Sequence, residues 1–248
     1  MTTIDTIERA SDAGPNAGGR SMPPPFIPPR ISDASRRIVV PRKGSLRGAL
    51  VTRGEVPRIV TYESDIERRV LLVLLARPDV VEVTEQVEPV RFLDEDGLPR
   101  KHYFDFKAVR RNGDRGLIAV KKLEWIERHP EFEDQLRLIA AQVPRSVADR
   151  VILMTDADAS RSAVHDAKLI HSVRADGATD YDASVRDIVS TLIGTTTVGC
   201  LVAASGLEGR GFRAVVRLID DGTLRVVDHS RIGYETRVAL VSNLEVQS

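Results

Sequence analysis

One stretch near the middle of the chain constrains the fold more than any other. It contains two short apolar segments, Tyr103–Phe106 and Leu117–Lys122, which are separated by the polar segment Arg111–Gly116. The polar segment holds an Asn-Gly pair and a further glycine, which tolerate the positive φ angles of tight hairpin turns. We therefore predict a β-hairpin. Because side chains two residues apart share one face of a strand, Asp105 and Lys121 can project from the same side of the sheet, near one edge.

A carboxylate with a lysine beside it indicates a particular chemistry. The carboxylate can hold a hard divalent cation, which polarises a phosphoryl oxygen and lowers the pKa of a bound water. The lysine can stabilise charge or orient the nucleophile. Asp105 and Lys121 are therefore candidates for metal-assisted hydrolysis of a phosphodiester. His102 is the nearest histidine, but a single histidine beside a strand is more often packed or exposed than a metal ligand.

A helix is predicted upstream of the hairpin, between Ser64 and Arg77. Ser64 suits the N-cap position, Glu67 has the capping-box spacing, and apolar residues follow at helical intervals until Pro78. Glu67 has two interpretations. It is either a capping or solvated residue, or a member of the same site as Asp105. Glu63, one turn earlier on the same helix face, is the reserve candidate.

The remaining segments before residue 178 predict a mixed α/β core. We expect strands at residues 80–87, 89–93 and 151–156, and helices at residues 130–142 and 162–172. Residues 94–97, three acids followed by a glycine, are expected to form an exposed turn that leads into the central hairpin. The last strand is continuously apolar, which is typical of a covered parallel strand. The order of these elements predicts a sheet flanked by helices.

The pattern changes after Asp176-Gly177. Three helical segments at residues 183–192, 198–204 and 210–219 precede two strand-like segments at residues 223–228 and 236–241. Three helices and a two-stranded wing predict a winged helix. Arg210, Arg213 and Arg217 on the third helix would then face phosphates or base edges of DNA. The alternative is a small helical domain for packing or dimerisation.

The N-terminal residues have a different composition from the rest. Residues 1–40 are rich in proline and glycine, and we expect a disordered arm. Between Arg30 and Ile59 the chain carries eight basic and two acidic residues, a local charge of +6 that suits phosphate contacts or a solvated tail. Arg42, Lys43 and Arg47 are the DNA-contacting candidates there. The expected domains are thus residues 1–40, 41–178 and 179–248.

Composition excludes several classes of protein. The whole chain has 36 basic and 36 acidic residues, so its net charge indicates neither a nucleic acid nor an acidic partner. Cys200 is the only cysteine, which excludes internal disulfides and a cysteine-cluster zinc site. No apolar run reaches the length of a membrane span, and no signal-peptide pattern opens the sequence. We expect a cytoplasmic protein that does not enter membranes.

The order of a glutamate-bearing helix, then Tyr-Phe-Asp-Phe, then Ile-Ala-Val-Lys resembles the PD-(D/E)XK nucleases, the restriction-endonuclease-like superfamily. Within it, the chain is most similar to the TnsA-type endonucleases of transposons, over about residues 45 to 240. The resemblance implies a Mg²⁺- or Mn²⁺-dependent endonuclease that cuts the ends of mobile elements. Its partners would be DNA and a transposase or another mobile-element protein. The implied metal ligands are Glu67, Asp105 and the Val120 carbonyl, with Lys121 as the catalytic lysine.

Two departures from the family pattern bear on activity. Phe104 stands where family members usually have proline, and Ala119 stands where they have an acid or an amide. A methyl group cannot bind a metal, so we expect Ala119 to make the chain weak or inactive unless Glu124 or Asp114 replaces the missing ligand. Two alternatives to an active nuclease stay open. One is an inactive nuclease fold that binds DNA or a transposase, and the other is a winged-helix regulator.

Overall fold

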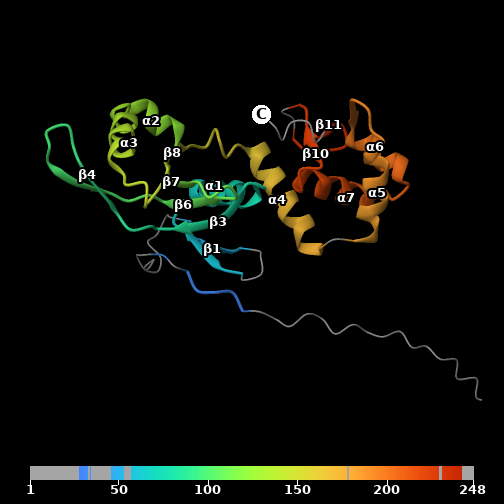
Figure 1. Ribbon diagram of the computed structural model, residues 1–248, viewed down its shortest axis with the longest axis horizontal. Helices are drawn as coiled ribbons and strands as arrows, with labels where there is room; N and C mark the ends of the chain where they lie inside the picture. Colours follow the sequence, from blue (N-terminus) through green and yellow to red (C-terminus); the bar gives the residue numbers. More distant parts are fainter. Residues whose placement is uncertain are drawn as a thin grey trace, which may run out of the picture.

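The structure is a computed structural model that describes residues 28–32, 34, 46–52, 57–177, 179–228 and 231–241. The chain forms a mixed α/β lobe and a smaller C-terminal lobe, with one long helix between them (Figure 1). Within these residues, no helix is long and apolar enough to cross a membrane. Most of the predicted arm, with Arg42 and Lys43, lies outside the described residues.

A four-stranded mixed sheet forms the centre of the first lobe. Its strands, in spatial order, are β3 (Val80–Glu85), β6 (Phe106–Arg110), β7 (Arg115–Val120) and β8 (Arg150–Met154). The predicted hairpin is confirmed, because β6 and β7 pair antiparallel and Gly113 has a φ of 89° in the turn. The parallel strand is also confirmed, since β8 pairs parallel with β7. The strand bounds differ, so that Asp105 lies directly before β6 and Lys121 directly after β7.

Helices cover both faces of this sheet, as predicted. On one face, α1 (Asp65–Ala76) and α4 (Arg161–Asp176) pack on Phe106, Ile118 and Val120. On the other face, α2 (Leu123–Arg128) and α3 (Glu131–Gln142) pack on Leu117 and Ala119. Helix α1 begins where its capping box predicts, because the Ser64 hydroxyl accepts the Glu67 N–H at 3.2 Å. The short helix α2 was not predicted.

The turn at residues 94–97 does not lead into the central hairpin, contrary to the prediction. It joins β4 (Val90–Leu93) to β5 (Pro99–His102), and these two strands form a separate antiparallel hairpin. The Asp94 carboxylate closes the turn by accepting the N–H groups of Asp96 and Leu98, and Gly97 takes a φ of 75°. This hairpin projects beyond α3 at one end of the molecule (Figure 1).

The C-terminal lobe contains three helices and a three-stranded antiparallel sheet. The helices are α5 (Asp180–Ser190), α6 (Val198–Ser205) and α7 (Glu208–Asp220). The sheet has the order β10 (Leu224–Val226), β11 (Arg237–Leu240) and β9 (Thr195–Thr197). The three predicted helices and the two C-terminal strands are present, and β9 adds a third strand that was not predicted.

Helix α4 belongs to the cores of both lobes and is longer than predicted. Its Val164 and Ala167 join the core under the central sheet, whereas Val173 packs with Val216 of α7. Arg174 donates hydrogen bonds to the carbonyl of Leu75, at the end of α1, and to the carboxylate of Asp220, at the end of α7. The two lobes are therefore tied together through one helix.

Arg58 does not take part in a solvated basic arm, contrary to the prediction. It is 7 % exposed and lies 3.8 Å from the carboxylate of Glu85, which is fully buried in β3. The hydroxyl of Ser32 also donates to Glu85. The backbones of Arg30 and Arg58 form an isolated parallel β-bridge. Arg58 directly precedes β2 (Ile59–Tyr62), which pairs with β1 (Gly48–Val51). A buried carboxylate needs a nearby cation and hydrogen bonds, and Arg58 supplies the charge.

Candidate active site

Asp105 and Lys121 lie at the same end of the central hairpin. Because β6 and β7 are antiparallel, the residue before β6 is beside the residues that end β7. The Asp105 N–H donates to the Ile118 carbonyl at 3.0 Å. The Val120 N–H in turn donates to the Asp105 carboxylate at 2.7 Å. The backbone of β7 thus holds the carboxylate in place, next to Lys121.

Glu67 of α1 is a capping residue and also lies near Asp105. One oxygen of its carboxylate accepts the Glu63 N–H at 2.7 Å, and the other accepts the Ser64 hydroxyl at 2.8 Å. Its negative charge is close enough to raise the pKa of Asp105. The capping interpretation of Glu67 is confirmed, and its place in one site with Asp105 stays a prediction.

The electrostatic state of Asp105 is unusual for an aspartate. Burial raises its pKa to about 6, the Val120 N–H and the Lys121 ammonium lower it, and the Glu67 charge raises it. A carboxyl group with this pKa releases its proton near neutral pH. A bound cation would favour the charged form, because an opposite charge at close range offsets the cost of burial.

Lys121 lies among aromatic side chains. Its Nζ is 5.5 Å from the ring centroid of Trp125 and 5.7 Å from that of Phe132, which are cation–π distances. His102 packs edge-on against Phe104 and also contacts Phe132. Burial and the charge of Lys121 lower the pKa of His102, which favours the neutral imidazole. The Lys121 ammonium therefore lies near two aromatic rings as well as near the Asp105 carboxylate.

Ala119 provides no ligand. Its side chain is 1 % exposed and packs in the core under α2 and α3. Among the residues that the structure describes, no group of three histidine, cysteine, aspartate or glutamate side chains could hold a metal ion. The oxygen donors predicted for the ion are the carboxylates of Glu67 and Asp105 and the main-chain carbonyl of Val120.

The reserve carboxylates lie in different places. Asp114 lies in the turn at the opposite end of the hairpin, where it pairs with Arg150, so it cannot replace the missing ligand. Glu124, in the first turn of α2, has a 77 % exposed side chain and pairs with Arg128 at 3.4 Å. Glu63 precedes the N-cap of α1 and is not on the helix, contrary to the prediction, and its N–H is bonded to Glu67.

A polar cavity of about 560 Å³ opens beside the start of α1. It is lined by Leu46, Ser64, Asp65, Ile66, Arg69, Lys122, Glu124 and Asp156. The Asp156 carboxylate accepts the Leu123 N–H at the start of α2, and Arg69 donates to the carbonyls of Asp156 and Ala159. Lys122 and Asp156 follow strands β7 and β8 and were not identified as site residues from the sequence, because only the sheet brings their loops together. The cavity adjoins the Glu67 and Lys121 segments.

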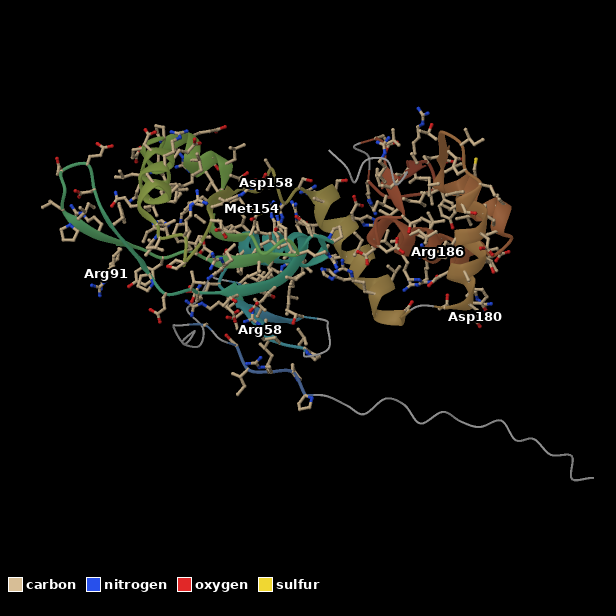
Figure 2. The ribbon with its side chains drawn as sticks, in the orientation of Figure 1. Arg58, Arg91, Met154, Asp158, Asp180 and Arg186 are labelled. Carbon is tan, nitrogen blue, oxygen red and sulfur yellow. The ribbon has the colours of Figure 1, made fainter. Side chains whose placement is uncertain are left out.

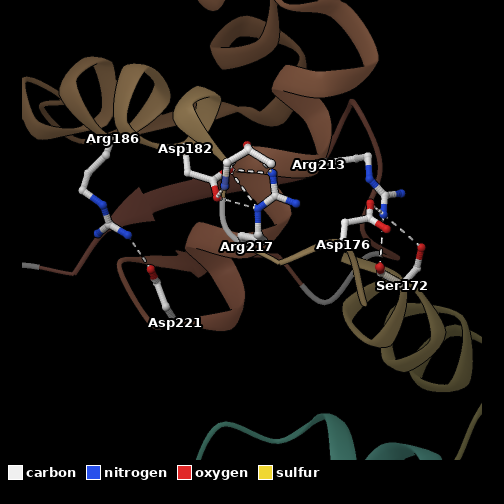
Figure 3. A network of polar contacts seen from close by, with 8 residues as sticks. Ser172, Asp176, Asp182, Arg186, Arg213, Arg217 and Asp221 are labelled. Carbon is white, nitrogen blue, oxygen red and sulfur yellow. Dashed lines mark hydrogen bonds and ion pairs between the residues drawn. The ribbon is translucent and has the colours of Figure 1, made fainter. Parts of the chain in front are cut away.

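The three arginines of α7 make contacts within the lobe. Arg213 pairs with Asp176 of α4, and Arg217 pairs with Asp182 of α5 at 2.6 Å (Figure 3). Arg210 donates to the Tyr181 hydroxyl at 2.8 Å and lies over that ring. Arg47 lies directly before β1. DNA binding by these residues stays a prediction.

The Arg217–Asp182 pair is expected to stabilise the fold rather than serve an outside ligand. Each side chain is only 14 % exposed, and the guanidinium makes several hydrogen bonds to the carboxylate. Arg217→Gln should lower the free energy of unfolding by about 2 kcal/mol, because it leaves a partly buried carboxylate without its cation. Arg210→Gln should change it by less than about 0.5 kcal/mol, since that guanidinium is exposed. Urea unfolding of both variants tests this, and equal effects would contradict it.

Comparison of the chain with models of known protein families and with curated proteins found no match in either case. The interpretation of this site therefore depends on its own geometry.

Proposed function

We propose that the chain is a divalent-metal-dependent DNA endonuclease of the restriction-endonuclease-like type, similar to the TnsA endonucleases of transposons. One observation carries the proposal. A mixed sheet with helices on both faces brings the Glu67, Asp105 and Lys121 segments to one end of a hairpin. There the charges of Glu67 and Lys121 both shift the pKa of Asp105. The substrate would be a phosphodiester bond at the end of a mobile DNA element, with a transposase or another mobile-element protein as partner.

The donor set fits one Mg²⁺ or Mn²⁺ ion. Glu67, Asp105 and the Val120 carbonyl offer only oxygen atoms, which hard cations prefer, and Mg²⁺ retains several waters for its other positions. The raised pKa of Asp105 supports this fit, because burial and the Glu67 charge disfavour the ionised carboxylate more than Lys121 favours it, and a bound cation would offset that cost. With only two carboxylates we expect weak binding of one ion.

In this proposal the ion, when bound, polarises the phosphate and makes a bound water more acidic. Asp105 holds its carboxylate in a fixed direction through the Val120 N–H. Lys121 places a positive charge beside the phosphate oxygens, and Trp125 and Phe132 keep its Nζ from extending into solvent. Glu67 is fixed by its capping hydrogen bonds and adds the second carboxylate.

We propose in addition that the C-terminal lobe is a winged helix. Support comes from the element order α5-β9-α6-α7-β10-β11 and from the strand order β10-β11-β9. Helix α7 would then be the recognition helix. Because Arg213 and Arg217 already pair with acids of α4 and α5, phosphate contacts by these two residues would require an exchange of partners. Arg210 makes no ion pair with a described residue, so it is the first candidate for DNA contact.

A second candidate function is DNA or transposase binding without cleavage. The observation that favours it is the buried methyl group of Ala119 at the position of the second ligand. Loss of one oxygen ligand and one negative charge weakens any site that must hold a divalent cation against water. The two candidates share the fold and the metal position, and they differ in whether the remaining ligands support catalysis.

Metal binding can be tested without any activity assay. Trp125 is the only tryptophan of the chain, and its ring lies 5.5 Å from the Nζ of Lys121. Titration with Mn²⁺ is expected to change its fluorescence, and Asp105→Asn should weaken the apparent affinity at least roughly tenfold. Asp114→Asn, at the far end of the hairpin, is the matched control and should leave the titration unchanged. An identical response in Asp105→Asn would remove Asp105 from the metal site.

A further inference from the structure

The β4–β5 hairpin has two chemically different faces. Directly opposite residues in an antiparallel pair share a face, so Phe92 and Arg100 lie on one side and Arg91 and Lys101 on the other. Phe92 is buried in the core with α3, and His102 packs on Phe132. The first face therefore attaches the hairpin to the lobe, and the second face points outward.

Two unpaired cations lie side by side on the outward face. Arg91 and Lys101 are both exposed, and neither side chain makes an ion pair or hydrogen bond with any residue in the described ranges. Figure 2 shows Arg91 pointing away from α2 and α3. Like charges directly opposite on a two-stranded ribbon destabilise it, so this pair does not serve the fold. A bound anion would remove the repulsion.

Apolar and aromatic groups flank these cations. Leu93 is 51 % exposed on the same face, and Tyr103, two residues beyond Lys101, is 61 % exposed. Among the hairpin residues 90–102, acidic residues occur only at the tip. Asp94 pairs there with Arg100, and Glu95 and Asp96 follow it in the sequence. The charges thus favour an anion along the flat face of the ribbon and disfavour one at its tip.

The outward face also lies next to the candidate active site. Tyr103 precedes Asp105 by two residues, and Lys101 precedes it by four. Four residues of extended chain span at most about 14 Å. That distance equals the rise of about four base pairs of duplex DNA. Asp105 therefore lies within the length of about four base pairs of a duplex whose backbone contacts Lys101.

We propose that the outward face of the β4–β5 hairpin binds the sugar–phosphate backbone of duplex DNA beside the cleavage site. The inference rests on the proposed function and adds a docking surface to it. Arg91 and Lys101 contact phosphates, while Tyr103 and Leu93 pack against the groove edge. A two-stranded ribbon has the width needed to lie in or along the major groove.

The test measures binding of the full chain to a labelled 30-base-pair duplex by fluorescence anisotropy, in EDTA, from 50 to 200 mM NaCl. The Arg91→Gln/Lys101→Gln double variant is expected to reduce the slope of log affinity against log salt by about 1.8, because each lost phosphate contact removes about 0.9. Arg100→Gln removes one charge from the opposite face and should leave the slope unchanged. Tyr103→Ser should weaken binding with an unchanged slope.

Three other outcomes would overturn the proposal in different ways. A double variant with the wild-type slope would remove the hairpin from the interface and leave the proposed function standing. Failure of the wild-type chain to bind any duplex would reject DNA as the substrate and the hairpin proposal with it. A loss of slope in Arg100→Gln about half as large as that in the double variant would mean that net charge alone matters. Thermal unfolding checks folding, and the double variant should be no less stable, since it relieves a repulsion.

Discussion

Asp105→Asn is expected to stabilise the protein by about 3 kcal/mol at pH 8 in metal-free buffer. The pKa of Asp105 is about 6 in the folded chain, against an ordinary value of 3.8. Each unit of difference corresponds to 1.36 kcal/mol. Asparagine has almost the same shape, and its carbonyl oxygen can still accept the Val120 N–H. The substitution therefore removes the buried charge and keeps the hydrogen bond.

The sign of the effect depends on pH. Between pH 3.8 and about 6 the folded state keeps a proton that the unfolded state has released, so stability of the native chain falls as the pH rises through this window. Above this window the Asp105 carboxylate is ionised in the folded state, and its burial lowers the free energy of unfolding by the full amount. The advantage of Asp105→Asn should thus be largest above pH 7 and disappear near pH 4. In melting temperature, 3 kcal/mol corresponds to roughly 6–12 °C for a chain of this size.

Unfolding in urea at pH 8 and at pH 4.5, with EDTA present, provides the measurement. Glu95→Gln is the matched control, because it neutralises an exposed carboxylate at the tip of the β4–β5 hairpin and should have no effect at either pH. Mn²⁺ at a concentration that saturates the native chain should stabilise it more than it stabilises the Asp105→Asn variant. A pH-independent gain, or a loss of stability at pH 8, would show that Asp105 carries no buried charge.

The sequence predicts the elements that local signals determine. The capping box starts α1 at Asp65 because Ser64 and Glu67 bond to each other across a single turn. The Asn-Gly turn similarly determines the β6–β7 hairpin, since Gly113 takes a positive φ there. The position of Asp105 beside Lys121 follows from that hairpin alone. For this reason the central part of the candidate site could be predicted before its geometry was known.

Other features depend on contacts between segments that are distant in the sequence. Strand β5 has the sequence Pro-Arg-Lys-His, which lacks apolar alternation, and it forms because β4 pairs with it. Arg58 resembles an arm residue in the sequence, but the buried carboxylate of Glu85 holds it inside. The aromatic surroundings of Lys121 come from α2 and α3, which pack on the sheet only in the complete fold. Local patterns contain no signal for such pairings.

Substitutions of Ala119 are expected to have the largest effect on activity. We expect the wild-type chain to nick supercoiled DNA weakly or not at all with Mg²⁺ or Mn²⁺. Ala119→Glu, which adds an oxygen ligand and a negative charge, should increase the metal-dependent rate at least about a hundredfold, the scale on which one charge-stabilising group affects catalysis. Ala119→Gln adds an oxygen without the charge, so its gain should be smaller.

A larger side chain at this position also has a structural cost. Ala119 is 1 % exposed among the residues under α2 and α3, so added atoms are expected to destabilise the fold by about 1–3 kcal/mol. Ala119→Leu is the control, because it adds similar bulk without an oxygen. It should be destabilised to a comparable degree and should gain no activity. Melting curves of each variant show whether the assay temperature leaves it folded.

The outcomes separate the two candidate functions. Cleavage that appears only in Ala119→Glu or Ala119→Gln, and that Lys121→Ala abolishes in those backgrounds, would identify the native chain as a disabled nuclease that binds DNA. Strong cleavage by the native chain that Asp105→Ala abolishes would show that the Ala119 methyl group is tolerated, with waters or Glu124 completing the ion's shell. Cleavage that survives both Asp105→Ala and Lys121→Ala would contradict the site, because its proposed metal ligand and its proposed catalytic lysine would then be dispensable.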